Sequence, residues 1–141
     1  MASNYRNAAE GLVTALQAGI PGLHGFAYPP LNIYDFPAAV VIPESYDPRL
    51  AFQGNSFLGT LRVVMLVTSG DSSEGWRMLY RHLDPTRTSH SVIKAVRADK
   101  TLDGKVDDSD VMRVENVGRR ALWGGDYYGF DVVVSFIKTV N

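Results

Sequence analysis

Histidines and aspartates are the residues of this chain most able to do chemistry, yet their spacing matches no known metal site. His24, His82 and His90 include no pair four residues apart, so the helical zinc motif is absent. The stretch 103–110 is rich in aspartate, but a calcium loop starting at Asp103 would have lysine at its third position and valine at its twelfth. We therefore expect structural or solvated histidines, an acidic surface turn and no metal.

Signatures of nucleophilic and acid–base catalysis are missing as well. The sequence has no Gly-x-Ser-x-Gly motif, and nothing in it aligns a serine with a histidine and an aspartate. The adjacent carboxylates Asp107 and Asp108 could act as an acid and a base in principle, but on a hydrophilic turn we expect them to be solvated. The absence of cysteine excludes thiol catalysis and a cysteine-based zinc site. We expect neither enzymatic activity nor a cofactor.

Length and net charge narrow the class of protein further. A chain of 141 residues suits one ordinary domain, and we expect 1–141 to form a single one. Its 14 basic and 15 acidic residues give a net charge of -1, whereas tight binding to nucleic acid usually needs a basic excess. No stretch is long and apolar enough for a membrane span, and the N-terminus lacks a signal-peptide pattern. These features fit a protein of the cytoplasm that does not enter a membrane.

Charge is distributed unevenly along the chain. Residues 76–98 carry mainly basic side chains, and residues 99–115 carry mainly acidic ones. One interpretation is a pair of solvated faces that partly neutralise each other. The other is a pair of complementary patches on neighbouring subunits, which would set their register. The candidate interface residues in these two stretches are Arg77, Arg81, Asp107, Asp108 and Asp110.

The first half of the chain predicts one helix and two strands. Residues 3–18 place apolar side chains on one helical stripe, and glycine and proline follow it. The apolar run 37–43 has proline at both ends, which suits a short strand whose terminal positions lack partners. We expect a long polar loop at 44–56. A strand whose odd-numbered positions are mainly apolar follows at 57–70.

The second half predicts two helices and a hairpin. Asp71 and Glu74 form a capping box that marks a helix start. Its expected buried stripe is Trp76, Leu79, Tyr80 and Leu83. A shorter helix is expected from about Ser89, and a strand over 111–122 leads through a Gly-Gly-Asp hairpin into a final strand. This order predicts an α+β domain, a mainly antiparallel sheet with helices packed on one face.

The final strand has two unlike faces. Alternate positions from Tyr128 to Phe136 are large and apolar, which predicts a core face against the helices. The intervening positions include Gly129, Asp131 and Ser135, a mixed set that must meet water, a ligand or another copy of the protein.

Aromatic and arginine side chains near two turns are further candidates for contacts. Such side chains are the ones most often found as interface anchors. The alternative is that these rings fold under their own loops. The candidates are Tyr46, Arg49, Phe52 and Phe57 around the polar loop, and Trp123, Tyr127 and Tyr128 around the hairpin.

The short opening helix and five stretches distributed over nearly the whole chain resemble the tail terminator proteins of long-tailed bacteriophages, particularly those that infect actinobacteria. The five stretches are IPGL (20–23), FPAAVVIPES (36–45), SFLGTLRVVMLVTSGD (56–71), IKAVRADKTLDGKVDD (93–108) and GGDYYGFDVVVSF (124–136). The most characteristic piece is ADKTLDGKVDD (98–108), in which a helix end leads through a glycine turn into acidic residues.

The resemblance implies a tail-terminator-like fold and a structural protein of the virion, with no cofactor. Such proteins form a ring, usually a hexamer, that caps the tail tube, stops its elongation and presents a surface to the neck and head connector. Assembled in the host cytoplasm, the ring lies at the head-proximal end of the tail, and DNA passes through its lumen without specific binding. A ring needs head-to-tail contacts that close on themselves.

Two hypotheses follow for this chain if it forms such a ring. The mixed face around Asp131 would lie toward the neighbouring subunit or the lumen. The loop 44–56 would become ordered against the tail tube or an adjacent subunit, because long loops are usually functional or mobile. Two other functions stay open: a head-completion or stopper protein of the neck, and a small cytoplasmic ligand-binding domain or enzyme that uses a cleft between sheet and helices.

Overall fold

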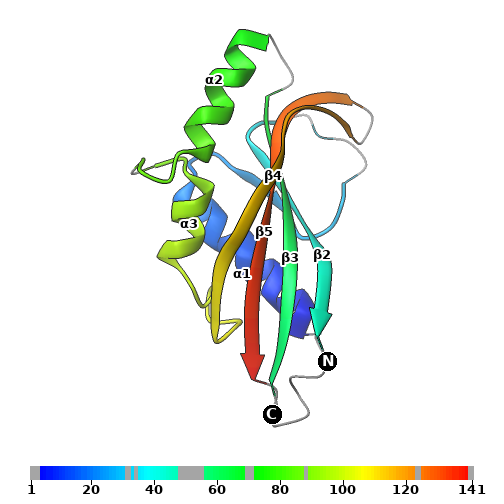
Figure 1. The fold of residues 1–141 in the computed structure, drawn as a ribbon, viewed down its shortest axis with the longest axis vertical. Coiled ribbons are helices and arrows are strands. Elements are labelled where there is room, and N and C mark those ends of the chain that lie inside the picture. Colours follow the sequence, from blue (N-terminus) through cyan, green and yellow to red (C-terminus); the bar gives the residue numbers. More distant parts are fainter. Residues whose placement is uncertain are drawn as a thin grey trace.

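The computed structural model describes most of the chain, and it has an α+β fold of three helices and five strands (Figure 1). Described are residues 4–30, 33, 35–47, 56–68, 72–87, 89–122 and 125–139, with the backbone alone at Asn4, Tyr46, Asp47, Ser56, Phe57, Ser72, Leu122 and Gly125. The elements in chain order are α1 (Asn4–Gly19), β1 (His24–Phe26), β2 (Ala38–Asp47), β3 (Ser56–Thr68), α2 (Ser72–Leu83), α3 (Val92–Ala98), β4 (Asp108–Leu122) and β5 (Gly125–Thr139).

The five strands form one sheet in the order β1-β2-β3-β5-β4. Every neighbouring pair is antiparallel except β1 and β2, which run parallel over three residues. The predicted α+β class with a mainly antiparallel sheet is therefore confirmed. The long β4–β5 hairpin places β4 at one edge of the sheet, and the short β1 forms the other edge (Figure 1).

All three helices contribute to one hydrophobic core on one face of the sheet (Figure 1). From α1, Leu12 and Leu16 are fully buried there, as the helical stripe predicts. The odd-numbered positions of β3 and the even-numbered positions of β5 point toward the same core, because side chains alternate between the two faces of a strand. The apolar face predicted for the final strand is thus a core face. The sheet residues of this core are Ala39, Val41, Leu61, Val63, Met65, Val67, Tyr128, Phe130, Val132, Val134 and Phe136.

Helix α2 packs on the sheet through a narrower stripe than the sequence predicts. Leu79 is fully buried, but Trp76 is 43% exposed and Tyr80 is 68% exposed, so their prediction as buried residues is wrong. The buried line runs instead through Gly75, Leu79 and His82. Gly75 is needed on this line, because a Cβ atom there would lie 2.5 Å from the ring of Tyr128. The helix therefore turns two aromatic rings outward.

The strand boundaries also differ from the prediction in the first half of the chain. β2 continues through Pro43 to Asp47, so residues 44–47 are strand and the connection to β3 is shorter than the expected loop 44–56. Proline is tolerated here because β1 pairs with β2 only up to Val40, which leaves the outer side of β2 as an edge farther along. The three-residue strand β1 was not predicted, and β4 begins at Asp108, earlier than expected.

A second, smaller hydrophobic cluster covers part of the opposite face of the sheet. Phe26, Phe36 and Ile33, which precede β2 or lie in β1, pack against the even-numbered positions of β2 and β3 and against Tyr127. Tyr127 is 5% exposed, and its ring centroid lies 5.6 Å from that of Phe36. Apolar side chains therefore cover one end of this face, and the rest of the face carries polar side chains.

Candidate assembly surface

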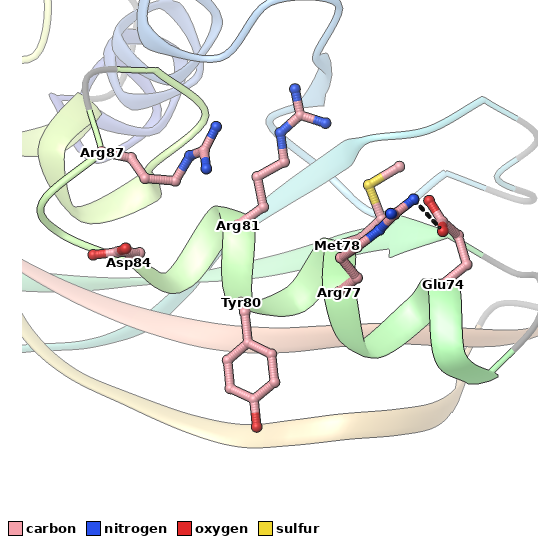
Figure 2. Close-up of a pocket in the computed structure, with 7 residues that line it drawn as sticks. All are labelled: Glu74, Arg77, Met78, Tyr80, Arg81, Asp84 and Arg87. Atoms are coloured by element: carbon pink, nitrogen blue, oxygen red, sulfur yellow. Dashed lines mark hydrogen bonds and ion pairs between the residues drawn. The ribbon is translucent and has the colours of Figure 1, made fainter.

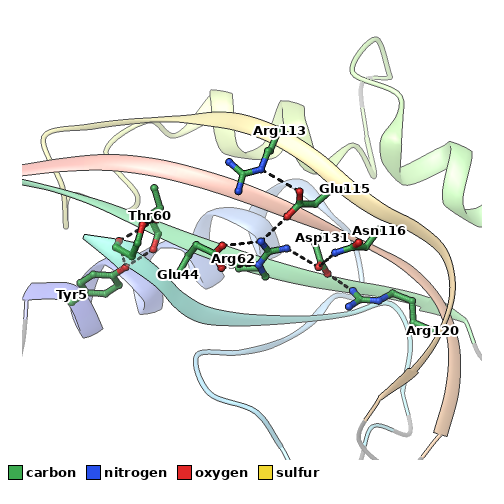
Figure 3. Close-up of polar contacts among 10 residues, drawn as sticks. Tyr5, Glu44, Thr60, Arg62, Arg113, Glu115, Asn116, Arg120 and Asp131 are labelled. Atoms are coloured by element: carbon green, nitrogen blue, oxygen red, sulfur yellow. Dashed lines mark hydrogen bonds and ion pairs between the residues drawn. The ribbon is translucent and has the colours of Figure 1, made fainter. Parts of the chain in front are cut away.

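The part of this second face that the small cluster leaves uncovered carries a network of charged side chains from four strands (Figure 3). We call it the ionic network. Its members, in the order in which β2, β3, β5 and β4 lie in the sheet, are Glu44, Arg62, Asp131, Arg113, Glu115, Asn116 and Arg120. It joins every strand of the sheet except β1.

Arg62 lies at the centre of the ionic network and reaches three carboxylates. Its Nε and Nη2 atoms each donate to Glu44 at 2.8 Å, and Nη1 donates to Asp131 Oδ2 at 2.8 Å. Nη2 also lies 2.6 Å from Glu115 Oε1. A planar guanidinium has donors in a fixed fork, so it can hold carboxylates from three neighbouring strands at defined positions. Lysine could not reproduce this arrangement.

Asp131 is the buried member of the network, with 2% of its side chain exposed. Its carboxylate accepts from Arg62 and Arg120 and from Asn116 Nδ2 at 2.8 Å. A buried carboxylate is stable only when hydrogen bonds and opposite charge replace its lost hydration. These three donors supply that compensation from within the chain.

Three β-bulges bring the partners into place. One lies in β2 at Glu44, which is the extra residue between two paired positions. Two lie in β4, at Met112 and in the segment 116–117. An extra residue shifts the alternation of side chains, so it re-aims the residues around it. Asn116 adopts a φ of 57°, a conformation that asparagine tolerates, and its amide reaches Asp131.

Arg62 keeps its carboxylate partners ionised. Its hydrogen bonds are the main cause that lowers the pKa of Glu44 and the pKa of Glu115 below the usual value, although partial burial opposes this. The same contacts, that with Glu44 first, raise the pKa of Arg62 above its usual value. The network has as many arginines as carboxylates, so this face presents fixed charges but little net charge.

Two predicted interface residues of the final strand, Asp131 and Tyr127, make their contacts within the chain. The side chain of Asp131 is covered by the chain's own arginines, and the hypothesis that this face lies toward a neighbouring subunit or the lumen stays a prediction. Tyr127 is also buried, against Phe36, so the alternative interpretation of a ring folded under its own structure applies. A change at Asp131 would disturb the fold itself before it reached any partner.

A second candidate surface lies on α2, where two other predicted residues come together (Figure 2). An open pocket of about 450 Å³ is lined by side chains of α2 and of the turn after it: Glu74, Arg77, Met78, Tyr80, Arg81, Asp84 and Arg87. Arg77 is exposed and pairs with Glu74 at 2.6 Å. Arg81 is half-buried, and it is turned to the same side of the helix as Arg87, away from Tyr80. We call this the α2 pocket.

Behind the α2 pocket lie two histidines in contact with each other. His82 is buried, and its Nδ1 donates to the Met78 carbonyl at 2.9 Å, which leaves Nε2 as a buried acceptor without a partner. The ring of His90 packs edge-to-face on it with 5.9 Å between centroids, and Arg81 Nη2 donates to His90 Nε2 at 3.1 Å. Burial is the main cause that lowers the pKa of both imidazoles, which favours their neutral forms. This is a structural role, as expected.

The acidic stretch partly neutralises the basic one within the same chain. Asp110 pairs with Arg97 of α3 at 3.1 Å, and this contact lowers the pKa of Asp110. Asp107 accepts from the backbone and the hydroxyl of Thr139, so it fixes the end of β5. Asp108 is exposed at the start of β4. The interpretation that the basic and acidic stretches partly neutralise each other therefore applies to Asp110. Contacts of these stretches between copies of the protein stay a prediction.

The remaining predicted interface residues lie outside the described residues or at their margin. Arg49, Phe52 and Trp123 lie outside the described residues. Tyr46 is placed as a β2 residue paired with Gly59, but nothing is described of its side chain. The hypothesis about the loop now concerns only 48–55, which is likewise outside the described part of the chain.

The ionic network itself was missed, although the sequence contains a signal for it. Arg62 and Asp131 are single charged residues in the middle of two apolar strands, and charges at such places are seldom unpaired. Once β3 and β5 are paired, Asp131 lies opposite Val64 and diagonal to Arg62. The partners Glu44 and Glu115 gave no such signal, because their positions depend on the bulges.

A third surface feature is a cleft beside the first turn of α1. It has a volume of about 710 Å³ and lies between α1, the end of β1 and the bulge of β2. Tyr5 closes one side, and its hydroxyl donates to the Ser45 carbonyl at 2.8 Å and to the Thr60 carbonyl. Partial burial raises the pKa of Tyr5, so the phenol stays protonated as a donor. The cleft is lined by Tyr5, Arg6, Ala9, Ala27, Pro43, Glu44 and Ser45.

Comparison with known proteins assigns no family to this arrangement. No protein-family model matches the chain, and no curated protein matches it significantly. Within the described residues, no helix is long and apolar enough to cross a membrane, and no group of three or more acidic or histidine side chains is placed to hold a metal ion.

Proposed function

We propose that this chain is a structural virion protein that forms a ring, of six subunits, on the end of a bacteriophage tail tube. The ring ends tail elongation and provides the surface for joining to the head. The observation that carries the proposal is where the motifs of the resemblance fall. FPAAVVIPES (36–45), SFLGTLRVVMLVTSGD (56–71) and GGDYYGFDVVVSF (124–136) contribute the paired central strands β2, β3 and β5, and the motif 93–108 contributes α3 and the acidic turn.

The charge pattern of the sheet supports a role in a DNA conduit. Free arginines on a lumen wall would hold phosphates and release counterions, which gives tight and salt-dependent binding. In the ionic network each arginine is paired with a carboxylate, and Arg62 is paired with three. A face of this kind can border passing DNA without retaining it.

The outward face of α2 supports a role in assembly. Trp76 and Tyr80 expose large parts of their rings, and Arg77 and Arg81 lie on the adjacent stripe of the same helix. Tryptophan, tyrosine and arginine are the side chains most often found at the energetic centre of protein interfaces. A head-completion or stopper protein of the neck would use the same features, and only its partner would differ.

A ligand-binding domain is the alternative from another class, and the cleft beside α1 favours it. Its volume of about 710 Å³ lies within the range of small-molecule sites. Its position at the surface between α1 and β2 differs from the cleft between sheet and helices that the sequence interpretation considered.

The deciding experiment adds the purified chain to polymerising tail tube protein of the same virus and images the products by negative-stain electron microscopy. A tail terminator shortens the tubes in proportion to its concentration and adds a ring at one end. Tubes of unchanged length with uncapped ends contradict the proposal. Binding to neck protein without an effect on tubes would instead indicate a stopper. A melting temperature raised by a small-molecule library member would indicate the ligand-binding alternative.

A further inference from the structure

Two arginines of the α2 pocket differ from the others that the structure describes, because they lack a carboxylate partner. Arg6, Arg62, Arg77, Arg97, Arg113, Arg119 and Arg120 each form an ion pair within the chain. Arg81 contacts only the ring nitrogens of His90, and Arg87 donates only to the Ser89 carbonyl at 3.4 Å. Both line the α2 pocket.

The polar atoms of this pocket are also incompletely satisfied. The Nε atom of Arg81 is buried and has no acceptor within hydrogen-bond distance in the described part of the chain. A buried donor without a partner is costly, more so when it is charged, and a bound water or ion is one of the explanations for such a group. Figure 2 shows the guanidinium groups of Arg81 and Arg87 on one side of α2, with Asp84 beside Arg87 and Glu74 near the other end of the helix. Both guanidinium groups therefore have donors available to an anionic group.

The same chain presents an unpaired carboxylate on a rigid tip. Asp103 is exposed in the turn 99–107, and its carboxylate makes no hydrogen bond or ion pair with any described residue. Its backbone is held in place, because its N–H donates to Asp99 Oδ2 at 2.9 Å and the neighbouring Leu102 is fully buried. A tip that is already ordered loses little conformational entropy when it binds.

The charges around the two sites are complementary. Asp103 stands between Lys100 and Lys105, so the tip has a negative centre with positive flanks. The α2 pocket is mainly basic, with Arg81 in the middle, Arg87 and Asp84 at one end and the Glu74–Arg77 pair at the other. Patterns that alternate in sign reject a shifted partner, because a shift would bring like charges together.

We propose that the turn 99–107 of one copy docks into the α2 pocket of the next, with the Asp103 carboxylate between Arg81 and Arg87. The two surfaces are different parts of the same chain, so the contact is head-to-tail, and an open assembly keeps one free tip and one free pocket at its two ends until the ring closes. The inference rests on the proposed function only in that the closed form of this contact is the ring. Tyr80 points to the other side of the helix from Arg81 and Arg87, so the contact depends on the charged side chains (Figure 2).

Charge reversal tests the contact with the full chain. R81E/R87E makes the pocket acidic, and D103K makes the tip basic; each variant alone should lose self-association in sedimentation velocity. Mixing the two variants should restore it, because each then offers the surface that the other needs. Lys94→Glu is the matched control on α3, since Lys94 is exposed and lies outside the α2 pocket, and it should associate like the unchanged protein.

A cysteine pair gives a second readout that does not depend on charge. The chain has no cysteine, so R87C/D103C introduces the only two thiols. Under oxidation it should form a ladder of disulfide-linked oligomers, whereas R87C/K94C should stay monomeric apart from random dimers. Circular dichroism checks that every variant is folded.

Three results would overturn the inference. One is self-association by the charge-reversed variants at the level of the unchanged protein; if tube capping persists with it, the proposed function stands and only this contact is wrong. Another is an unchanged protein that stays monomeric at all concentrations and gives no ladder. A third is a pocket that binds inorganic phosphate in a manner abolished by R81E/R87E while association is unaffected, which would make it a small-anion site.

Discussion

Replacing Arg62 by methionine tests the physical account of the ionic network. Methionine has a similar length and can cover the same part of the sheet, so the change removes charge and hydrogen bonds with little loss of packing. Three carboxylates, on Glu44, Glu115 and Asp131, then lie close together without their common partner. The protein should fold but with a lower free energy of unfolding.

The size of the loss follows from burial. Removing one member of a buried ion pair costs about 3–5 kcal/mol, because the remaining charge loses its compensation. Asp131 keeps Arg120 and Asn116 as donors, and Arg62 itself is 17% exposed, so we expect the lower end, about 3 kcal/mol. The pairs with the half-exposed Glu44 and Glu115 are screened by solvent and add little.

Urea unfolding followed by circular dichroism measures this loss. The matched control is Arg119→Met, which removes an exposed ion pair with Asp126 on the same hairpin and should cost less than about 1 kcal/mol. Glu44 and Glu115 have lowered pKa values in the folded state, so their pairing stabilises the protein above the ordinary carboxyl pKa of 4.5 and is lost as the pH falls. Because these two pairs contribute little, the gap between the unchanged protein and Arg62→Met should narrow only slightly in acid. Equal losses for the two variants, or a gap that widens in acid, would refute the reasoning.

Two further predictions concern the helices. Burial is the main cause that lowers the pKa of His82, so the protein takes up a proton when it unfolds below pH 6.5, and its free energy of unfolding should fall as the pH drops from 6.5 toward the pKa of the folded state. In urea titrations at several pH values, His82→Leu should make this fall shallower. An unchanged slope would speak against burial as the cause. Leu79→Ala should cost about 2–5 kcal/mol because Leu79 is fully buried, while Tyr80→Ala should change thermal stability much less; similar losses would mean that α2 packs as the sequence predicted.

The fold was largely predictable because its signals are local. Apolar alternation in residues 57–70 and 128–136 indicated two strands with one buried face, and the helical stripe of α1 indicated its packing. The orientation of α2 was not predictable in this way. Trp76 and Tyr80 fit an apolar stripe by spacing, but a glycine at 75 lets the helix approach Tyr128 on another line, and this depends on tertiary contact.

The candidate surfaces were less predictable, since they depend on pairs that are distant in sequence. Asp131 was noticed as unusual, but its partner Arg62 is contributed by another strand, and the interpretation of an open contact surface did not consider it. β-Bulges leave no regular pattern, so the positions of Glu44 and Glu115 could not be derived from alternation. Arg77 and Arg81, which were named only as candidate interface residues of the basic stretch, both line the α2 pocket, because residues four apart lie on the same side of a helix.

The bulged ionic network has a consequence for how the chain reaches its native pairing. A strand that slips by two residues keeps the same alternation of side chains between the two faces, so the alternation alone does not oppose such a slip. Here such a slip would carry Arg62 away from Asp131 and leave a buried charge without a partner. The misaligned sheet is therefore destabilised even where both alignments bury the same apolar area. The buried ion pairs therefore help to fix the register of the strands within a single chain, before any contact with a second subunit.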